Sequence, residues 1–457
     1  MSTRRISSVC HVGNIAIGGN NPIRIQSMAT TDTNDTEGSV AQAKRIIDAG
    51  GELVRFTTQG IREAENMKNI SARLKADGYT QPLVADVHFT AHTADVAAQY
   101  CEKVRINPGN YVDPGRTFRH LKYTDEEYAA ELSKIEQKLV PFINICKTHK
   151  TAVRFGVNHG SLSDRIMSRY GDTPEGIVES CLEFLRIFRR EQFDDVVISI
   201  KASNTVVMVT TVRLLVKAMD TEGMHYPLHL GVTEAGEGED GRIKSAVGIG
   251  ALLTEGIGDT IRVSLSEEPE YEIPVARKIV DSIEECIALR AQAEASINDD
   301  TITLTVDEPN WETFQLKAAM ATGGLLIDRK ATKLELCSSR FTREKMTSLA
   351  DAILQAARIK FTKTEYISCP GCGRTLYNLQ ETIARIKAAT SRLVGLKIGI
   401  MGCIVNGPGE MADADYGYVG AGRGRISLYR GKECVEKNIP EAEAVDRLLQ
   451  LIDSDKR

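Results

Sequence analysis

Three cysteines near the end of the sequence have a spacing that is typical of a metal site. Cys369 and Cys372 form a CPGC motif, and Cys403 follows 31 residues later in the string MGCIVNGPGE. Thiolates bind both zinc and iron–sulfur clusters, so the motif alone does not separate these cofactors. A structural zinc site needs a fourth cysteine or histidine, and all eight histidines lie at or before position 229. Cys434 could complete a four-thiolate zinc site, which stays open as an alternative.

Glu410 offers a different fourth ligand. It lies seven residues after Cys403, beyond a glycine-proline turn, and an iron–sulfur cluster can accept one ligand that is not a thiolate. A carboxylate is a hard and exchangeable ligand, so a substrate oxygen could replace it on one iron. The surrounding glycines would let backbone N–H groups approach the sulfides and tune the reduction potential. This pattern favours a cluster that does redox chemistry.

Five basic residues form a second group with a chemical implication. Each lies in or at the end of a strand-like segment, and the five are Arg55, Arg105, Arg154, Lys201 and Arg262. If these strands share one sheet, the five cations converge and repel one another unless a polyanion binds among them. A diphosphate would balance this charge. The alternative is that each cation pairs with a neighbouring acid or extends into solvent at the rim.

Other polar residues follow the same segments. Glu234 would face those cations and is the carboxylate best placed to pass a proton, unless it is only a salt-bridge partner. His88 and His159 also follow such segments, but isolated histidines are more often structural. The string GEGEDG at 236–241 resembles a phosphate-binding loop, yet its three acidic side chains would repel phosphate. We expect it to be the turn that starts the next helix.

The segments that position these residues alternate with helix-length amphipathic stretches, which is typical of βα units around a parallel sheet. After a short hairpin near 9–17, the eight strand-like runs are 23–28, 53–57, 83–87, 104–107, 152–157, 196–201, 228–232 and 260–264. A longer excursion at about 111–150 follows the fourth run. Their number and even spacing favour a TIM-type (β/α)8 barrel over a doubly wound open sheet. Catalysis in such barrels takes place at the C-terminal ends of the strands, where these polar residues lie.

The pattern divides the chain into three parts. Residues 1–292 are expected to form the barrel that binds the substrate, 293–357 an insert with the single tryptophan, and 358–457 a small α/β domain with the three cysteines. In the last part we expect a helix after the CPGC motif. Strands should follow at 397–401, 416–419 and 425–429, and a closing helix from about 440.

Composition limits the classes of protein that need to be considered. Apolar residues make up 42% and charged residues 26%, which is ordinary for a soluble globular protein. A net charge of −5 gives no general reason to bind nucleic acid. No apolar run approaches the ~18 residues that cross a bilayer, and no signal-peptide pattern is seen at the start. Ten cysteines are too sparse for a disulfide scaffold. We expect a cytoplasmic protein with no nucleic-acid or membrane role.

Nine strings of the sequence resemble those of the 4-hydroxy-3-methylbut-2-enyl diphosphate synthases, iron–sulfur enzymes of the non-mevalonate isoprenoid pathway. The first seven lie within 1–292 and are IQSMATTDTNDT, ADVHF, VRINPGN, VRFGVNHGSL, SIKASN, LGVTEAG and IRVSLS. The other two, SCPGCGRTL and GCIVNGPGE, lie within 358–457. These strings are specific to a family, whereas the fold signals above are general. The resemblance therefore covers both outer parts of the chain.

The resemblance implies an oxidoreductase that dehydroxylates and opens 2-C-methyl-D-erythritol 2,4-cyclodiphosphate. It implies a four-iron four-sulfur (4Fe-4S) cluster held by Cys369, Cys372, Cys403 and Glu410, with Glu410 and Glu234 counted as catalytic and Glu234 passing a proton. The implied substrate-binding residues are Arg55, Arg105, Arg154, Asn158, Lys201, Ser203, Thr233, Arg262 and Ser264. Reduced ferredoxin or flavodoxin would deliver the two electrons one at a time.

The insert departs from the family pattern. Short members join the barrel directly to the cluster domain, whereas long members carry a second barrel-like domain between them. A segment of about 65 residues suits neither form and resembles a shortened remnant of the long one. In the short form the cluster domain caps the barrel of a partner subunit, and in the long form it could cap its own. We expect a homodimer, and the choice of barrel stays open.

Overall fold

The computed structural model describes residues 4–88, 90–113, 120–404, 407–411 and 413–455. Eight parallel strands form one sheet in the order β8-β7-β6-β5-β4-β3-β10-β9. A bridge between Ile198 and Leu228 joins the two ends of this order, so the sheet closes into a barrel. The strands are β3 (Arg24–Met28), β4 (Leu53–Thr58), β5 (Leu83–Val87), β6 (Lys103–Ile106), β7 (Ala152–Asn158), β8 (Val196–Lys201), β9 (His229–Leu230) and β10 (Thr260–Ile261). The prediction of a TIM-type barrel is confirmed.

The first six predicted strands match the structure closely, but the last two are shorter than expected. Val232 and Val263, which the sequence placed in strands, are fully buried but lie beyond the ends of β9 and β10. Strands of a parallel barrel are covered on both faces, so they form nearly continuous apolar runs. Such a run indicates burial, and it does not show where the hydrogen-bonded ladder ends.

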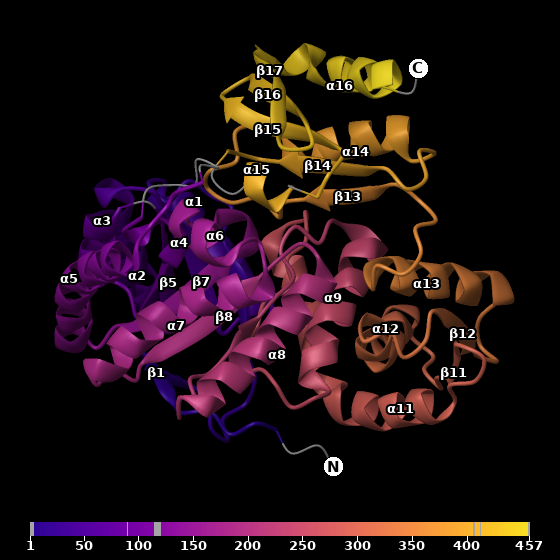
Figure 1. Cartoon of the computed structure of the whole chain (residues 1–457), viewed down its shortest axis with the longest axis horizontal. Helices are drawn as coiled ribbons and strands as arrows, with labels where there is room; N and C mark the ends of the chain where they lie inside the picture. The colour runs from indigo at the N-terminus through magenta and orange to yellow at the C-terminus, as the bar shows by residue number, and fades with distance from the viewer. Residues whose placement is uncertain (1–3, 89, 114–119, 405–406, 412, 456–457) are drawn as a thin grey trace.

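Helices surround the barrel on its outside (Figure 1). They are α1 (Thr36–Asp48), α2 (Ile61–Ala76), α3 (Ala91–Ala97), α4 (Pro108–Tyr111), α5 (Asp125–His149), α6 (Asp164–Tyr170), α7 (Pro174–Arg190), α8 (Thr205–Thr221), α9 (Gly238–Leu253), α10 (Glu272–Asp281) and α11 (Ile283–Ala295). Two short 3₁₀ turns, η1 (His159–Ser161) and η2 (Pro269–Tyr271), follow β7 and β10. Among the helices that the structure describes, none combines the length and apolar character that a bilayer crossing requires.

An N-terminal hairpin closes the bottom of the barrel. It consists of β1 (Cys10–Val12) and β2 (Ile15–Ile17), as the sequence predicts. Cys10 and Ile17 pack against Leu53 and Val84, which lie at the N-terminal ends of two barrel strands. This apolar plug leaves the opposite, C-terminal end of the barrel as the open one, where catalytic residues are expected.

The barrel interior contains a buried lysine, Lys103. Lys103 on β6 is fully buried, and its Nζ has no hydrogen-bond partner within the described ranges. Burial, and then the nearby Arg154, lower the pKa of Lys103 to about 7. An unfolded lysine has a pKa of about 10.4, so the folded chain binds this proton less well. The amine therefore destabilises the fold increasingly as the pH falls from about 10 toward 7.

Replacing Lys103 with methionine should stabilise the protein. We expect the free energy of unfolding at pH 7 to rise by about 2–4 kcal/mol, because a buried charge without a partner gives way to an apolar side chain. Urea unfolding followed by circular dichroism at pH 7 and pH 9 measures the change, which should be smaller at pH 9. The exposed Lys68 on α2 is the control, and Lys68→Met should change stability by less than about 0.5 kcal/mol. A less stable Lys103→Met variant would contradict this account.

Residues 293–357 form a βαβα unit beside the barrel (Figure 1). Its elements are β11 (Thr301–Thr305), α12 (Trp311–Ile327), β12 (Lys333–Cys337) and α13 (Arg343–Ala356), and β11 pairs with β12 in parallel. The largely buried helix α12 packs against α9 of the barrel. Gly323 allows the two backbones to approach, since a Cβ there would lie 3.0 Å from the Cα of Val247. The insert thus shares one continuous apolar core with the barrel.

The C-terminal domain is a five-stranded sheet with helices. Its elements are β13 (Glu365–Ser368), α14 (Leu379–Thr390), β14 (Lys397–Met401), α15 (Gly407–Glu410), β15 (Tyr416–Gly422), β16 (Arg425–Arg430), β17 (Glu433–Pro440) and α16 (Glu441–Asp455). The predicted helices and three predicted strands are confirmed. The sequence did not predict β13, a strand of four residues that directly precedes the CPGC motif. It also missed β17, an edge strand whose exposed residues give no apolar alternation.

The string GEGEDG at 236–241 leads into helix α9, as expected, and it also joins the three parts of the chain. Each of its three acidic side chains contacts a different segment. The pairs are Glu237 with Lys387 of the C-terminal domain, Glu239 with Nε1 of Trp311 in the insert, and Asp240 with Lys363 in the connection between them. The pair of Glu237 and Lys387 thus links the barrel to the C-terminal domain, which lies over the mouth of the barrel in the same chain (Figure 1).

Candidate active site between the barrel and the cysteine loops

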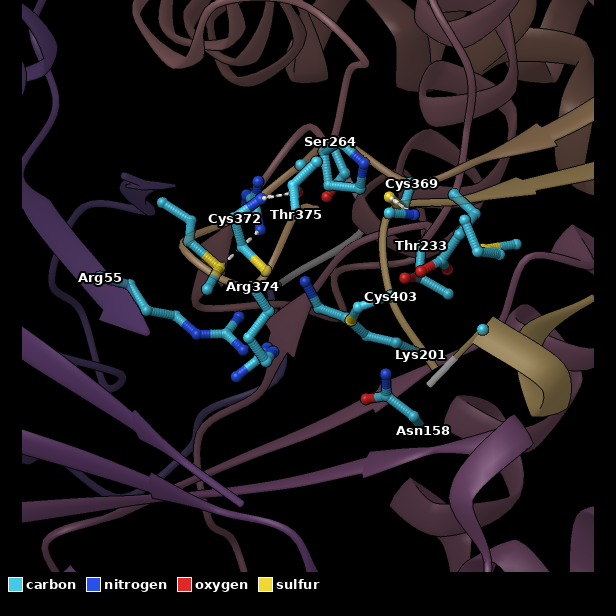
Figure 2. A pocket seen from close by; sticks show the side chains of 18 of the residues that line it. Arg55, Asn158, Lys201, Thr233, Ser264, Cys369, Cys372, Arg374, Thr375 and Cys403 are labelled. Carbon is cyan, nitrogen blue, oxygen red and sulfur yellow. Dashed lines mark hydrogen bonds between the residues drawn. The ribbon is translucent and has the colours of Figure 1, made fainter. Parts of the chain in front are cut away.

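A cavity lies between the barrel mouth and the C-terminal domain (Figure 2). Seven of the nine predicted substrate-binding residues line it, and these are Arg55, Arg154, Asn158, Lys201, Thr233, Arg262 and Ser264. Glu234 lines it as well, and so do the three cysteines of the C-terminal loops. The cations and the cysteines were predicted from separate parts of the sequence, and the structure brings them to one cavity.

Two predicted residues lie beside the cavity without lining it. Arg105 lies behind its wall, where its Nη2 donates to the carbonyl oxygen of Gly156 at 2.9 Å and to Oδ1 of Asn158 at 3.1 Å. Ser203 donates from Oγ to the backbone oxygen of Glu410 at 3.1 Å. Arg105 therefore positions Asn158, and Ser203 contacts the chain that carries Glu410.

The cations of the cavity differ in whether an acid neutralises them. Arg262 pairs with the buried Glu272 at 3.1 Å, and Arg55 pairs with Asp86 at 2.7 Å. Arg154 and Lys201 are almost completely buried, and among the described residues no carboxylate lies within ion-pair distance of either. Burial lowers the pKa of both groups well below the usual range, and neighbouring cations lower it further. Within the described part of the chain, Arg154 and Lys201 thus have no acid partner, so the interpretation that every cation pairs with an acid is wrong for them.

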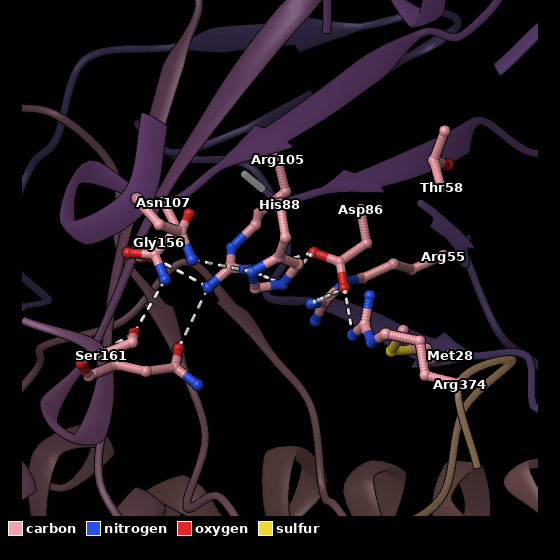
Figure 3. A network of polar contacts seen from close by, with 12 residues as sticks. Met28, Arg55, Thr58, Asp86, His88, Arg105, Asn107, Gly156, Ser161 and Arg374 are labelled. Carbon is pink, nitrogen blue, oxygen red and sulfur yellow. Dashed lines mark hydrogen bonds and ion pairs between the residues drawn. The ribbon is translucent and has the colours of Figure 1, made fainter. Parts of the chain in front are cut away.

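Asp86, at the C-terminal end of β5, is surrounded by cations (Figure 3). Its oxygens accept from Arg55 at 2.7 Å, from Arg105 at 3.1 Å and from Arg374 at 3.3 Å. Burial opposes ionisation of this carboxyl, yet the cations outweigh it and hold its pKa well below the ordinary value. Burial lowers the pKa of the adjacent His88 to about 3, so that imidazole is neutral. His88 is therefore a structural member of this network.

The cysteine loops follow the C-terminal ends of neighbouring parallel strands. Cys369 follows β13 directly and Cys403 follows β14 by two residues, so the sheet brings both to one edge. Sγ of Cys369 accepts a hydrogen bond from the backbone N–H of Gly402 at 3.2 Å (Figure 2). The backbone N–H of Cys372 donates to Oγ1 of Thr375 at 3.0 Å, which closes the loop. Burial raises the pKa of the Cys369 thiol to about 12.

Cys434 does not lie near these loops. It is on β17, and β13 and β17 are the two outer strands of the sheet. Four strand spacings of about 4.8 Å place them roughly 19 Å apart. Its Sγ contacts the backbone oxygen of Glu436 on the same strand at 3.6 Å. The four-thiolate zinc site that needs Cys434 is therefore incompatible with this fold.

Glu234, which lines the cavity, and Glu410, the last residue of α15, are both buried. Burial raises the pKa of each, and Glu234 raises that of Glu410 further. Oε2 of Glu234 and Oε1 of Glu410 are buried and have no hydrogen-bond partner in the described part of the chain. Glu234 has a φ of 48°, a backbone conformation that is unusual for a residue other than glycine and is often found at functional sites.

His159 was not among the predicted substrate-binding residues, and the structure gives it a different partner. His159 is on η1 and pairs with Asp172 at 2.6 Å, which supports a structural role for this histidine.

Arg374 lines the cavity but was not predicted. Its position two residues after Cys372 was the available signal, because a cation in a cysteine loop lies close to any group that the loop faces. Residues 405 and 406 of the string GCIVNGPGE lie outside the described residues.

Comparison with known proteins agrees with this geometry. A family model described as "GcpE TIM-barrel domain" matches residues 7–277, and one described as "GcpE protein C-terminal domain" matches residues 365–454. Curated proteins named 4-hydroxy-3-methylbut-2-en-1-yl diphosphate synthase (flavodoxin) are similar over 98% of this chain. The protein from Bacteroides fragilis is 51% identical, and the alignment covers 96% of its length. The protein from Porphyromonas gingivalis is 44% identical, and the alignment covers 97% of its length.

The alignment with the Bacteroides fragilis protein also shows a difference in length. It spans 598 positions, whereas this chain has 457 residues, so at least 141 positions have no counterpart here. Both family models nevertheless match, one on the barrel and the other on the domain with the cysteine loops. The chain belongs to the GcpE family.

Proposed function

We infer that this chain is an oxidoreductase that converts 2-C-methyl-D-erythritol 2,4-cyclodiphosphate to 4-hydroxy-3-methylbut-2-enyl diphosphate. The reaction consumes two electrons and two protons, breaks one bond from carbon to the diphosphate and one to a hydroxyl group, and releases water. The observation that carries this conclusion is the cavity, in which buried cations, two of them without an acid partner among the described residues, face three cysteines. The cations suit a diphosphate, and the cysteines suit a redox cofactor.

The cysteine loops fit a 4Fe-4S cluster. Three thiols border one cavity, and the backbone N–H of Gly402 already donates to the sulfur of Cys369. The buried Oε1 of Glu410 lacks a hydrogen-bond partner among the residues described, which suits a carboxylate that awaits a ligand. We propose that Cys369, Cys372, Cys403 and Glu410 would hold the cluster. When bound, it would supply single electrons and a Lewis-acidic iron for the substrate oxygen.

The barrel residues would bind and orient the substrate. Arg154 and Lys201 have no acid partner among the described residues, so they are free to bind the diphosphate oxygens directly. Arg55 and Arg262 are held in place by Asp86 and Glu272 and can donate with their remaining N–H groups. Three neutral residues can fix the orientation of the ring without adding charge, and these are Asn158, Thr233 and Ser264. Arg105 and Ser203 would support this set from behind.

Glu234 is proposed to move a proton. Burial raises the pKa of this carboxyl, so it holds a proton more readily than an exposed glutamate does, and its Oε2 is buried without a hydrogen-bond partner among the described residues. It lines the cavity, so that proton can pass to the hydroxyl oxygen that leaves as water. The nearby cations stabilise the carboxylate after the transfer, since Lys201 and Arg262 both favour its charged form.

The proposal extends to the electron donor, the origin of the insert and the oligomeric state. Flavodoxin is the proposed electron donor, because the curated relatives carry that word in their names, and ferredoxin is the alternative. We propose that residues 293–357 are a shortened remnant of the segment that makes those relatives longer. The described residues that line the cavity all come from one chain, so the cavity does not need a second subunit to complete it. The homodimer stays a prediction.

Anaerobic turnover tests this function. Protein with a reconstituted cluster should form 4-hydroxy-3-methylbut-2-enyl diphosphate from the cyclodiphosphate when reduced flavodoxin is supplied, and none without a reductant. Product can be followed by phosphorus NMR. Turnover without a reductant would instead indicate a lyase or synthase. A fully loaded cluster with no turnover under any low-potential donor would contradict the proposal.

A further inference from the structure

We propose that Arg374 of the cysteine loop binds the diphosphate from the side of the C-terminal domain, with Asp86 of the barrel as its anchor. This inference rests on the proposed function, and it adds a residue that the family resemblance did not supply. It also gives the arrangement of the two domains a role in binding, since one cation of the anion site comes from the cysteine loop and the others from the barrel.

The position of Arg374 supports this role. It lies two residues after Cys372, in the loop between β13 and α14, and its side chain is 8% exposed. Its Nη2 pairs with Oδ2 of Asp86 at 3.3 Å, the same oxygen that Arg55 contacts at 2.7 Å. Arg374 also lines the cavity together with Arg55, Arg154 and Lys201. The loop thus adds a guanidinium to the cluster of cations that the barrel supplies (Figures 2 and 3).

Two further nitrogens of Arg374 face no acceptor in the described part of the chain. Its Nε and Nη1 are buried and have no hydrogen-bond partner among the residues that the structure describes. A guanidinium offers five N–H groups in a fixed plane, and phosphate oxygens are acceptors that match this geometry. Leaving a buried charged donor unsatisfied is unfavourable, so the arrangement is suited to a ligand with several oxygens. Arg154 is in the same state, with its Nε and Nη1 buried and unpaired.

The local charge leads to the same ligand. One carboxylate, Asp86, contacts three guanidinium groups, those of Arg55, Arg105 and Arg374. The adjacent His88 is neutral and does not change this sum. The cluster therefore has a surplus of positive charge, to which Arg154 and Lys201 add. A diphosphate would offset it, and would favour the arrangement in which the cysteine loop is seated against the barrel.

Substitutions of Arg374 test the proposal through binding as well as turnover. We expect Arg374→Met to weaken inhibition by inorganic pyrophosphate, and to raise KM for the cyclodiphosphate, by about 10- to 100-fold. Arg374→Lys keeps the charge but loses the planar donor set, so its loss should be intermediate. The control is Arg385→Met, at an exposed position on α14 of the same domain, which should leave both constants unchanged. Visible absorbance of the cluster should be the same in all four proteins.

The outcomes separate this inference from the function on which it rests. Unchanged pyrophosphate affinity in Arg374→Met would overturn the inference, even if turnover fell. Loss of cluster absorbance in both Arg374 variants would also overturn it, because the residue would then serve the loop itself. If the unaltered protein binds pyrophosphate but does not reduce the cyclodiphosphate, the proposed function fails. In that case the pyrophosphate measurements on the variants still decide whether Arg374 binds the anion.

Discussion

Replacing Cys372 with serine is expected to reduce turnover by more than roughly 10³-fold and to remove the visible absorbance near about 400 nm that an iron–sulfur cluster gives. Serine is nearly the same size, but its hydroxyl does not ionise near neutral pH, and its hard oxygen is a poor replacement for a thiolate on iron. Iron and acid-labile sulfide should fall together with the absorbance. Metal analysis and the visible spectrum of anaerobically purified protein measure this result directly.

The matched control is Cys434→Ser. Cys434 is on the far edge strand of the same domain, and its sulfur contacts the backbone oxygen of Glu436 and the side chain of Tyr429, away from the cysteine loops. We expect this variant to keep its cluster, its absorbance and its turnover. Loss of a colourless zinc ion in both variants, with no iron in the unaltered protein, would instead support a structural zinc domain.

Replacing Arg154 with methionine should have opposite effects on binding and on stability. Affinity for the cyclodiphosphate should fall by about 10²- to 10³-fold, because one charge-assisted contact to the diphosphate is lost. The free energy of unfolding without substrate should rise by about 1–3 kcal/mol, because a buried guanidinium without an acid partner is removed. Calorimetric titration and urea unfolding measure the two changes.

Arg262→Met is the matched comparison, since Arg262 lines the same cavity but pairs with the buried Glu272. It should also weaken binding, but it should lower the free energy of unfolding by about 3–5 kcal/mol, because Glu272 would be left buried without its partner. If both variants lost stability by similar amounts, Arg154 would have a counter-charge that this account does not include. If neither lost affinity, the cavity would not be the diphosphate site.

The barrel and the cation set were predictable from the sequence because their signals are local. Each strand is an apolar run, and each of Arg55, Arg154 and Lys201 has a fixed offset from such a run. In a parallel barrel that offset is enough to place a side chain at the mouth. Predicting that these cations gather at the barrel mouth therefore required only the strand order and the assumption that the sheet closes into a barrel.

The pairing of these cations was not predictable in the same way. Whether Arg262 has a partner depends on Glu272, and whether Arg105 reaches the cavity depends on Asp86 and Asn158. Such contacts are decided by side-chain packing across different elements, and sequence spacing contains little information about them. Arg374 was missed for this reason, since its partner Asp86 lies 288 positions away.

The contact between Trp311 and Glu239 gives the protein a built-in optical reporter. The chain has one tryptophan, so its fluorescence comes from a single place, at the start of α12. Its indole N–H donates to Glu239, which follows directly on the loop that holds the C-terminal domain over the barrel. Emission from this indole is sensitive to the carboxylate beside it. Its spectrum can therefore reveal, in real time and without any label, whether this junction shifts during a catalytic cycle.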